Sequence, residues 1–89
     1  MIEKQLTIIN KLGLHARAAA KFVATAGRYA SSVRICKGAQ DVDGKSIMAV
    51  MMLAASIGTP LIIRTDGEDE EACMDAIEAL INNYFDEGE

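Results

Sequence analysis

The sequence predicts an α+β open-faced sandwich, in which helices cover one face of an antiparallel sheet. The predicted strands alternate apolar and polar residues, which is typical of a sheet with one covered face and one wet face. Segments with helical spacing separate these strands, in the order β-α-β-β-α-β-α. The chain has 89 residues, so we expect one domain over residues 1–89 and exclude a doubly wound nucleotide-binding fold.

The chain begins with a predicted strand and helix. The strand spans residues 2–9, where β-branched and alternating residues dominate. After a loop, a helical period starts at Ala16 and ends at Gly27, which is a common residue just past a helix end. The apolar stripe of this helix is expected at Ala16, Ala19, Ala20, Val23 and Ala26.

A hairpin follows, formed by residues 32–37 and 40–43 around Gly38. Alternation places Val33 and Ile35 on its inner face and Arg34 and Cys36 on its outer face. Both cysteines, Cys36 and Cys73, are expected to be reduced, buried or half-buried apolar side chains, since no CxxC motif is present.

The second half predicts a helix, a strand and a last helix. Ser46 caps a helix that runs to about residue 53 or 55, with an apolar stripe at Val50, Leu53, Ala54 and Ile57. A strand spans residues 61–65, and Asp66-Gly67 forms a turn. The last helix begins at an acidic run, which suits a helix start. Its stripe is expected at Cys73, Ala76, Ile77, Leu80, Ile81 and Tyr84.

Composition excludes several classes of function. Four aromatic side chains and no Trp argue against a protein that binds nucleic acid by base stacking. One His and two distant cysteines cannot supply a zinc site, and we expect no metal and no cofactor. The longest apolar run, residues 47–55, is far shorter than the roughly 20 residues of a membrane span. Without a signal peptide, we expect a cytoplasmic protein that is not inserted into a membrane.

Charge is divided unevenly along the chain. Residues 1–45 hold eight Lys or Arg and three Asp or Glu, a balance of +5, whereas residues 46–89 hold one and ten, a balance of −9, which together give the net charge of −4. An uneven but purely solvated surface is one interpretation. The other is a basic patch that steers an acidic partner, in which Lys21 and Arg28 would lie on the same side of the first helix as Arg17.

His15 is the candidate for covalent chemistry. It precedes the first helix, where backbone N–H groups without helical acceptors and a positive dipole favour a bound anion. The same positive end is expected to help keep the imidazole neutral and nucleophilic. Arg17 has the planar donor fork that suits phosphate oxygens, and Gly13 permits backbone conformations closed to other residues. This constellation could hold a phosphoryl group on a ring nitrogen.

The segment Asp43-Gly44-Lys45-Ser46 partly matches the end of a phosphate-binding P-loop. Its spacing from Gly38 is one residue too long and the fold is too small, so ATP binding is rejected. Ser46 is therefore predicted to be a helix N-cap, at a position that tolerates an added phosphate. The apolar stripe of the next helix leaves four side chains near the surface: Ile47, Met48, Met51 and Met52. Two interpretations are open, because the methionines could instead fill the core, or the four side chains could form an exposed patch that binds partners.

The motif Gly13-Leu14-His15-Ala16-Arg17-Ala18, followed by Gly44-Lys45-Ser46-Ile47-Met48, resembles the HPr family of histidine-containing phosphocarriers of the bacterial phosphotransferase system. The resemblance covers essentially the whole chain and implies a four-stranded antiparallel sheet with three helices on one face. It also implies phosphorylation of His15 on Nδ1 by Enzyme I, transfer to an IIA-type acceptor, assistance by Arg17, and phosphorylation of Ser46 where an HPr kinase exists. Such a carrier is not a stand-alone enzyme.

Ala18 departs from the family pattern, because many members have Pro there. The acidic end and the motif NKLGLHARAA also resemble the nitrogen-branch paralogue, so sugar transport and regulation both stay open. One alternative is a small interaction module in which His15 is incidental and the Met-rich helix binds a partner. An acyl-carrier protein is a weaker alternative, because that fold is helical and this sequence contains alternating strands.

Overall fold

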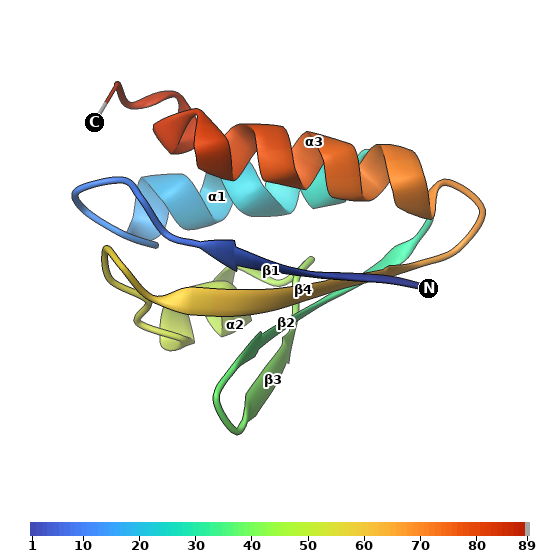
Figure 1. Cartoon of the computed structure of the whole chain (residues 1–89), viewed down its shortest axis with the longest axis horizontal. Coiled ribbons are helices and arrows are strands. Elements are labelled where there is room, and N and C mark those ends of the chain that lie inside the picture. The colour runs from blue at the N-terminus through green and yellow to red at the C-terminus, as the bar shows by residue number, and fades with distance from the viewer. Residues whose placement is uncertain (89) are drawn as a thin grey trace.

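A computed structural model describes residues 1–88 and confirms the predicted α+β fold and element order (Figure 1). The elements are β1 (Ile2–Thr7), α1 (Ala16–Ala26), β2 (Ser32–Lys37), β3 (Gln40–Asp43), α2 (Ile47–Met52), β4 (Pro60–Asp66), α3 (Glu70–Asn82) and a 3-10 turn, η1 (Tyr84–Asp86). The hairpin strands have the bounds that alternation predicted. β1 is two residues shorter than expected, and β4 is one residue longer at each end.

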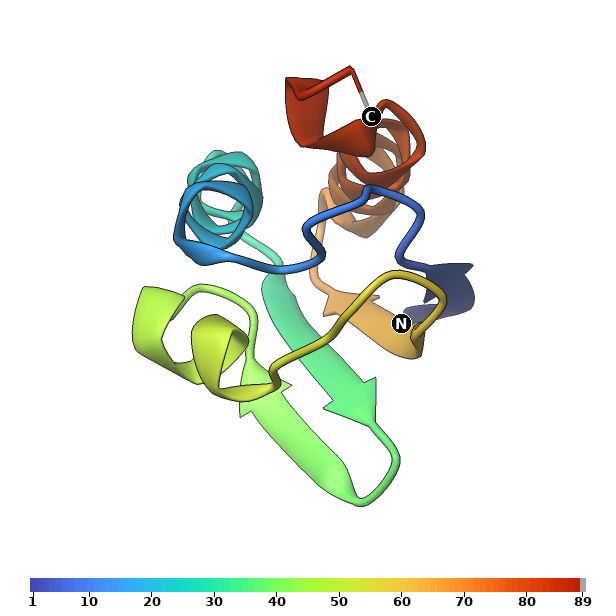
Figure 2. The same cartoon turned by 90° about the vertical axis from the view of Figure 1, so that its left-hand side faces the viewer.

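The four strands form one antiparallel sheet in the order β1-β4-β2-β3. Consecutive registers align apolar residues across it: Leu6 pairs with Leu61, and Ile35 pairs with both Ile63 and Val42. These side chains form the inner face, against which all three helices contribute to a single hydrophobic core. Figure 2 shows α1, α2 and α3 on the same side of the twisted sheet.

The buried face of α1 differs from the predicted stripe. Ala16 and Ala20 are exposed, and the buried residues are Ala18, Ala19, Phe22, Thr25 and Ala26. The reason is that alanines occupy both faces of this helix, so their spacing carries little contrast. The bulky, fully buried Phe22 sets the face that packs on the sheet. Gly27 follows the helix as expected.

The ends of α2 and α3 correct two further predictions. Because α2 ends at Met52, Ala54 and Ile57 lie beyond it and are exposed instead of completing its stripe. In α3, Met74 is buried, whereas Tyr84 lies outside the helix and is exposed. The chain leaves α3 through η1, which buries Phe85 in the core.

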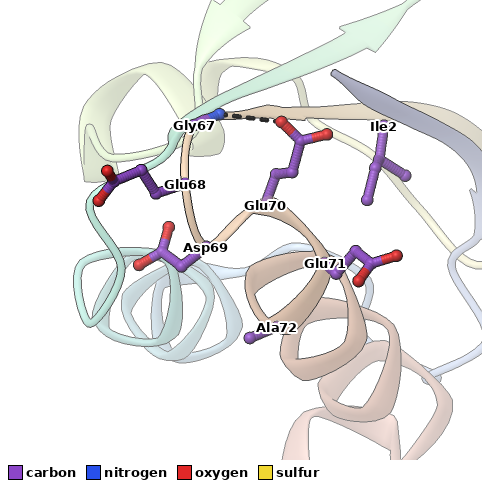
Figure 3. Close-up of a pocket in the computed structure, with 7 residues that line it drawn as sticks. All are labelled: Ile2, Gly67, Glu68, Asp69, Glu70, Glu71 and Ala72. Carbon is purple, nitrogen blue, oxygen red and sulfur yellow. Dashed lines mark hydrogen bonds between the residues drawn. The ribbon is translucent and has the colours of Figure 1, made fainter.

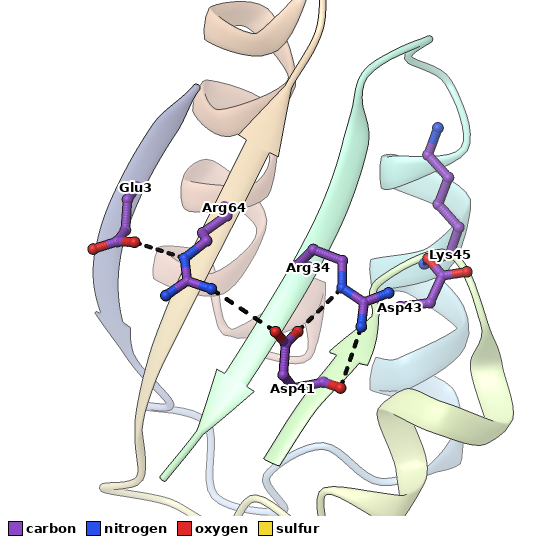
Figure 4. A network of polar contacts seen from close by, with 6 residues as sticks. All are labelled: Glu3, Arg34, Asp41, Asp43, Lys45 and Arg64. Carbon is purple, nitrogen blue, oxygen red and sulfur yellow. Dashed lines mark hydrogen bonds and ion pairs between the residues drawn. The ribbon is translucent and has the colours of Figure 1, made fainter. Parts of the chain in front are cut away.

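The outer face of the sheet carries a polar network that links all four strands (Figure 4). Arg64 on β4 reaches Glu3 on β1 at 2.6 Å and Asp41 on β3 at 3.8 Å, and Asp41 also accepts from Arg34 on β2 at 3.1 Å. Such exposed pairs contribute little individually. Cys36 lies on this face, as alternation predicted, yet its strand neighbours bury it; both cysteines are free and buried.

None of the helices in the described part of the chain has the length and apolar character that crossing a bilayer requires.

Candidate functional site

A tight loop between β1 and α1 carries His15 to one end of the molecule. Gly13 has a φ of +68°, and a Cβ built on it would lie 2.4 Å from the carbonyl oxygen of Ala55. The next residue, Leu14, is buried and donates its N–H to the same oxygen at 2.8 Å. Only glycine combines this conformation with such a close approach, so the Gly13 prediction is confirmed. The loop therefore pins the chain just before His15.

His15 is the N-cap residue of α1, which agrees with its predicted place just before the first helix. Its backbone is extended, with φ −72° and ψ 176°, and its carbonyl accepts from the Ala19 N–H at 2.9 Å. The imidazole makes no capping hydrogen bond, so the first-turn N–H groups have neither helical acceptors nor a side-chain cap. With 28% of its side chain exposed, the ring is accessible beside these donors.

The imidazole Nε2 is hydrogen-bonded to the Glu87 carboxylate, 72 residues further along the chain. A carboxylate can only accept, so Nε2 carries the hydrogen. In the neutral ring this places the lone pair on Nδ1. The other carboxylate oxygen of Glu87 accepts from Asn10 Nδ2 at 3.1 Å, and the same amide donates to the Gly13 carbonyl at 2.8 Å. Sequence reasoning missed both Asn10 and Glu87.

The C-terminal turn that presents Glu87 is anchored to the core and to α1. Tyr84, Phe85 and Asp86 all have positive φ, and the buried Phe85 side chain fixes this left-handed turn to the core. Lys21 on α1 donates to the Phe85 carbonyl at 2.9 Å. The ammonium of Lys21, predicted to meet a partner, thus also holds the turn against α1.

Arg17 lies on the first turn of α1, beside a pocket of about 310 Å³. Its guanidinium is exposed and makes no hydrogen bond or ion pair with residues 1–88. The pocket places this cation and Lys21 beside two carboxylates; its lining residues are Leu12, Arg17, Lys21, Asp86 and Glu87. The pocket therefore places Arg17 near Glu87, the residue that bonds the His15 ring, whereas His15 itself is not among its lining residues.

The charge division of the sequence does not produce two opposed faces. Five of the eight basic residues in the first half have partners within residues 1–88: Lys4, Lys21, Arg34, Lys37 and Lys45. Asp86 and Glu87, from the acidic half, join the His15 end. Arg28 does not share a helix face with Arg17, because α1 ends at Ala26. Among the basic residues of the first half, Arg17 is the one closest to His15 along the chain.

Ser46 is the N-cap of α2, and its Oγ accepts from the Ala49 N–H at 3.3 Å. This confirms the predicted cap. The cap positions α2 next to α1, with which it packs. Figure 2 looks onto this end of the molecule, where α2 lies close to the start of α1.

The outer side of α2 exposes a group of apolar side chains that we name the Met patch: Ile47, Met48, Met51 and Met52. Met48 and Met52 are 71% and 72% exposed, whereas Val50 on the inner side is fully buried. Core filling is therefore excluded for these methionines. Leu12, in the His15 loop, is also exposed. An apolar surface thus lies on α2, beside the helix that His15 caps.

A second cavity, of about 470 Å³, lies at the start of α3 (Figure 3). It is lined by acidic residues, of which Glu70 accepts from the Gly67 N–H at 3.2 Å and pairs with the Met1 amino group at 2.9 Å. The hydrogen bond to that amino group lowers the pKa of Glu70. These contacts join the N-terminus, just before β1, to the start of α3.

Within residues 1–88, no His, Cys, Asp and Glu side chains gather as metal ligands would.

Comparison with known proteins places this arrangement in a family. The family model described as the PTS HPr component phosphorylation site matches residues 2–83. The phosphocarrier protein HPr of Pseudomonas aeruginosa is 63% identical over 86 residues, which cover 96% of each chain. The crystal structure of HPr-C-His from Thermoanaerobacter tengcongensis matches with a TM-score of 0.94 and 41% identity, over 98% of each chain.

This chain belongs to the HPr family. The resemblance inferred from the two sequence motifs is thereby confirmed, and with it the phosphocarrier class within the phosphotransferase system. The phosphocarrier protein NPr of Shewanella violacea is also similar, at 38% identity over 97% of this chain and 94% of that protein.

Proposed function

We propose that this HPr-family protein accepts a phosphoryl group on Nδ1 of His15 from phosphorylated Enzyme I and passes it to IIA-type acceptors. The observation that carries the proposal is the hydrogen bond from Nε2 to Glu87, because it leaves Nδ1 as the nitrogen with a free lone pair in the neutral ring. The ring lies at the start of α1, where first-turn N–H groups can donate hydrogen bonds to phosphate oxygens.

Arg17 is proposed to bind the phosphoryl group after transfer. Its guanidinium lies two residues beyond His15, is exposed, and borders the 310 Å³ pocket. A guanidinium can donate two parallel hydrogen bonds to phosphate oxygens, and it stabilises negative charge where this accumulates during transfer.

The Met patch is proposed as the docking surface for Enzyme I and the IIA-type acceptor. Lys21 and Arg28, which line pockets next to η1 and α3, are proposed as separate basic contacts to these partners. The side chains of the Met patch are apolar, unbranched in three of four cases and exposed on one helix. Flexible Met side chains adapt to different partners, which suits a carrier that must bind a donor and an acceptor in turn. Ser46 starts the same helix, so phosphorylation there by an HPr kinase would place negative charge next to this surface.

The test is to incubate the protein with Enzyme I and phosphoenolpyruvate and to record the phosphorus NMR spectrum. We expect an acid-labile signal of Nδ1-phosphohistidine in the wild type and none in His15→Ala, with the fold unchanged in the variant. An Arg17→Ala variant should be phosphorylated more slowly at equal concentrations. A phosphorylated His15→Ala protein would refute the assignment.

The exposed Met patch also favours a second candidate, a regulatory module that binds partners without being phosphorylated. In that case partner binding would survive in His15→Ala, and the wild type would give no phosphohistidine signal under the same conditions.

A further inference from the structure

We infer that Glu87, held by Asn10, is the residue that positions the His15 ring for phosphoryl transfer, an inference that rests on the proposed function of His15. Both carboxylate oxygens of Glu87 are used. One accepts from His15 Nε2, and the other accepts from Asn10 Nδ2 at 3.1 Å. The Asn10 amide also donates to the carbonyl of Gly13 at 2.8 Å, so the carboxylate is tied to the loop that carries the ring.

Packing and hydrogen bonds hold the Glu87 side chain in place. Only 10% of its side chain is exposed, although it lies close to the end of the chain. Asn10 is fully buried, and Phe85 anchors the preceding turn in the core. Lys21 holds the same turn through the Phe85 carbonyl. A group that orients a reactive side chain must itself be held by packing and hydrogen bonds, and Glu87 meets both conditions.

The contact does two things for the chemistry of the ring. It keeps the hydrogen on Nε2, which leaves the lone pair of the neutral ring on Nδ1. When this lone pair forms the bond to phosphorus, the bond from phosphorus to the donor atom of phosphorylated Enzyme I breaks and its electron pair stays on the donor. The Nε2 proton remains on the ring, which becomes positively charged, and the Glu87 carboxylate faces that charge.

The reverse half of the cycle uses the same arrangement. When the acceptor nucleophile attacks phosphorus, the bond from phosphorus to Nδ1 breaks and its electron pair returns to Nδ1. The ring leaves as the neutral imidazole with hydrogen on Nε2, still bonded to Glu87. The carboxylate thus serves acceptance and donation without taking the proton, as the carboxylate of a Ser-His-Asp triad does.

The inference is tested with Glu87→Ala, which removes the acceptor, and Glu87→Gln, which keeps an acceptor oxygen without the charge. Glu71→Gln is the matched control, because it removes an exposed carboxylate on α3 that is not among the residues lining the Arg17 pocket. Nitrogen NMR of the imidazole reports which ring nitrogen carries the hydrogen in each unphosphorylated protein. The rate of phosphorylation by Enzyme I is measured alongside, as kcat and KM.

We expect hydrogen on Nε2 in the wild type and in Glu71→Gln, a mixture of tautomers in Glu87→Ala, and recovery of the Nε2 form in Glu87→Gln. In Glu87→Ala, kcat should fall about 10-fold with KM unchanged, because water can reach the ring; this is the lower end of the loss seen when the hydrogen-bond partner of a metal-bound His is removed. If Glu87→Ala retains the wild-type tautomer and kcat, the inference is overturned. A wild type that Enzyme I does not phosphorylate overturns the proposed function instead, while the NMR measurement still decides the positioning.

Discussion

Gly13→Ala is the substitution that the structure predicts to damage the His15 loop most directly. At a φ of +68°, an alanine costs about 1–2 kcal/mol, of which about 0.4–1 kcal/mol is recovered through the less flexible unfolded chain. Its Cβ would also lie 2.4 Å from the Ala55 carbonyl oxygen and 2.9 Å from Ser56 Cα. Both are backbone atoms, so this segment must move. The movement breaks or stretches the hydrogen bond from Leu14, worth about 1 kcal/mol.

Together these effects predict a loss of about 1–2.6 kcal/mol in the free energy of unfolding, or roughly 4–20 °C in Tm for a domain of this size. Gly38→Ala is the matched control. Gly38 has a similar φ of +59°, but nothing lies within 4 Å of the added Cβ. Only the conformational cost remains there, so the expected loss is at most about 1.6 kcal/mol.

Urea unfolding at equilibrium separates the two variants, because the midpoint should shift while the slope m stays constant. Phosphorylation of His15 below the melting range should be slowed in Gly13→Ala, whose loop is displaced, and unchanged in Gly38→Ala. The reasoning is refuted if both variants lose the same stability, or if Gly13→Ala matches the wild type in stability and rate.

Three further predictions follow from the same structure. Replacing Met48 and Met51 by Lys should raise the KM for Enzyme I with little change in Tm, because both side chains are exposed; a collapse in Tm would contradict this. Ser46→Asp should slow His15 phosphorylation, more so at low salt, while Tm holds or rises because a carboxylate suits a helix start; equal rates at low salt would leave Ser46 as a cap only. Hydrogen bonds from Ser31 and the Ala30 N–H lower the pKa of Asp69, so its contribution to stability is present above the ordinary pKa of 3.8 and lost as the pH falls through the lower folded-state pKa. Asp69→Asn should therefore be less stable than the wild type at neutral pH, and urea unfolding in acid should show this gap closing.

The strands could be predicted closely from the sequence because alternation is a local signal. In β2, the polarity of each residue indicates which face of the sheet it lies on. Val33 and Ile35 are on the covered face in the structure, as the alternation predicted. The face of α1 could not be predicted as well. Alanine is small enough to be tolerated on either side of a helix, so its spacing does not decide which side packs on the sheet.

The site was predictable only where its residues lie close together in the sequence. Gly13, His15 and Arg17 form one short motif, and Ser46 carries its own cap signal. The bond to Glu87 could not be foreseen, because it depends on a left-handed turn at Tyr84–Asp86. Consecutive non-glycine residues rarely adopt positive φ, and the side chains of these three residues do not predict such a conformation. The tertiary burial of Phe85 selects that conformation.

The residues that would perform phosphoryl transfer and those that place them belong to different layers of the molecule. The His15 ring, Arg17 and the Met patch are accessible, so substitutions there remove few core contacts. Leu14 and Phe85, which fix the flanking loop and turn, are buried in the core. Since burial dominates stability and accessibility is required for transfer between proteins, variants of the outer group should lose rate before stability, and variants of the inner group should lose both together. Asn10 and Glu87 connect the two layers, because they carry the rigidity of the buried loop and turn to an accessible ring.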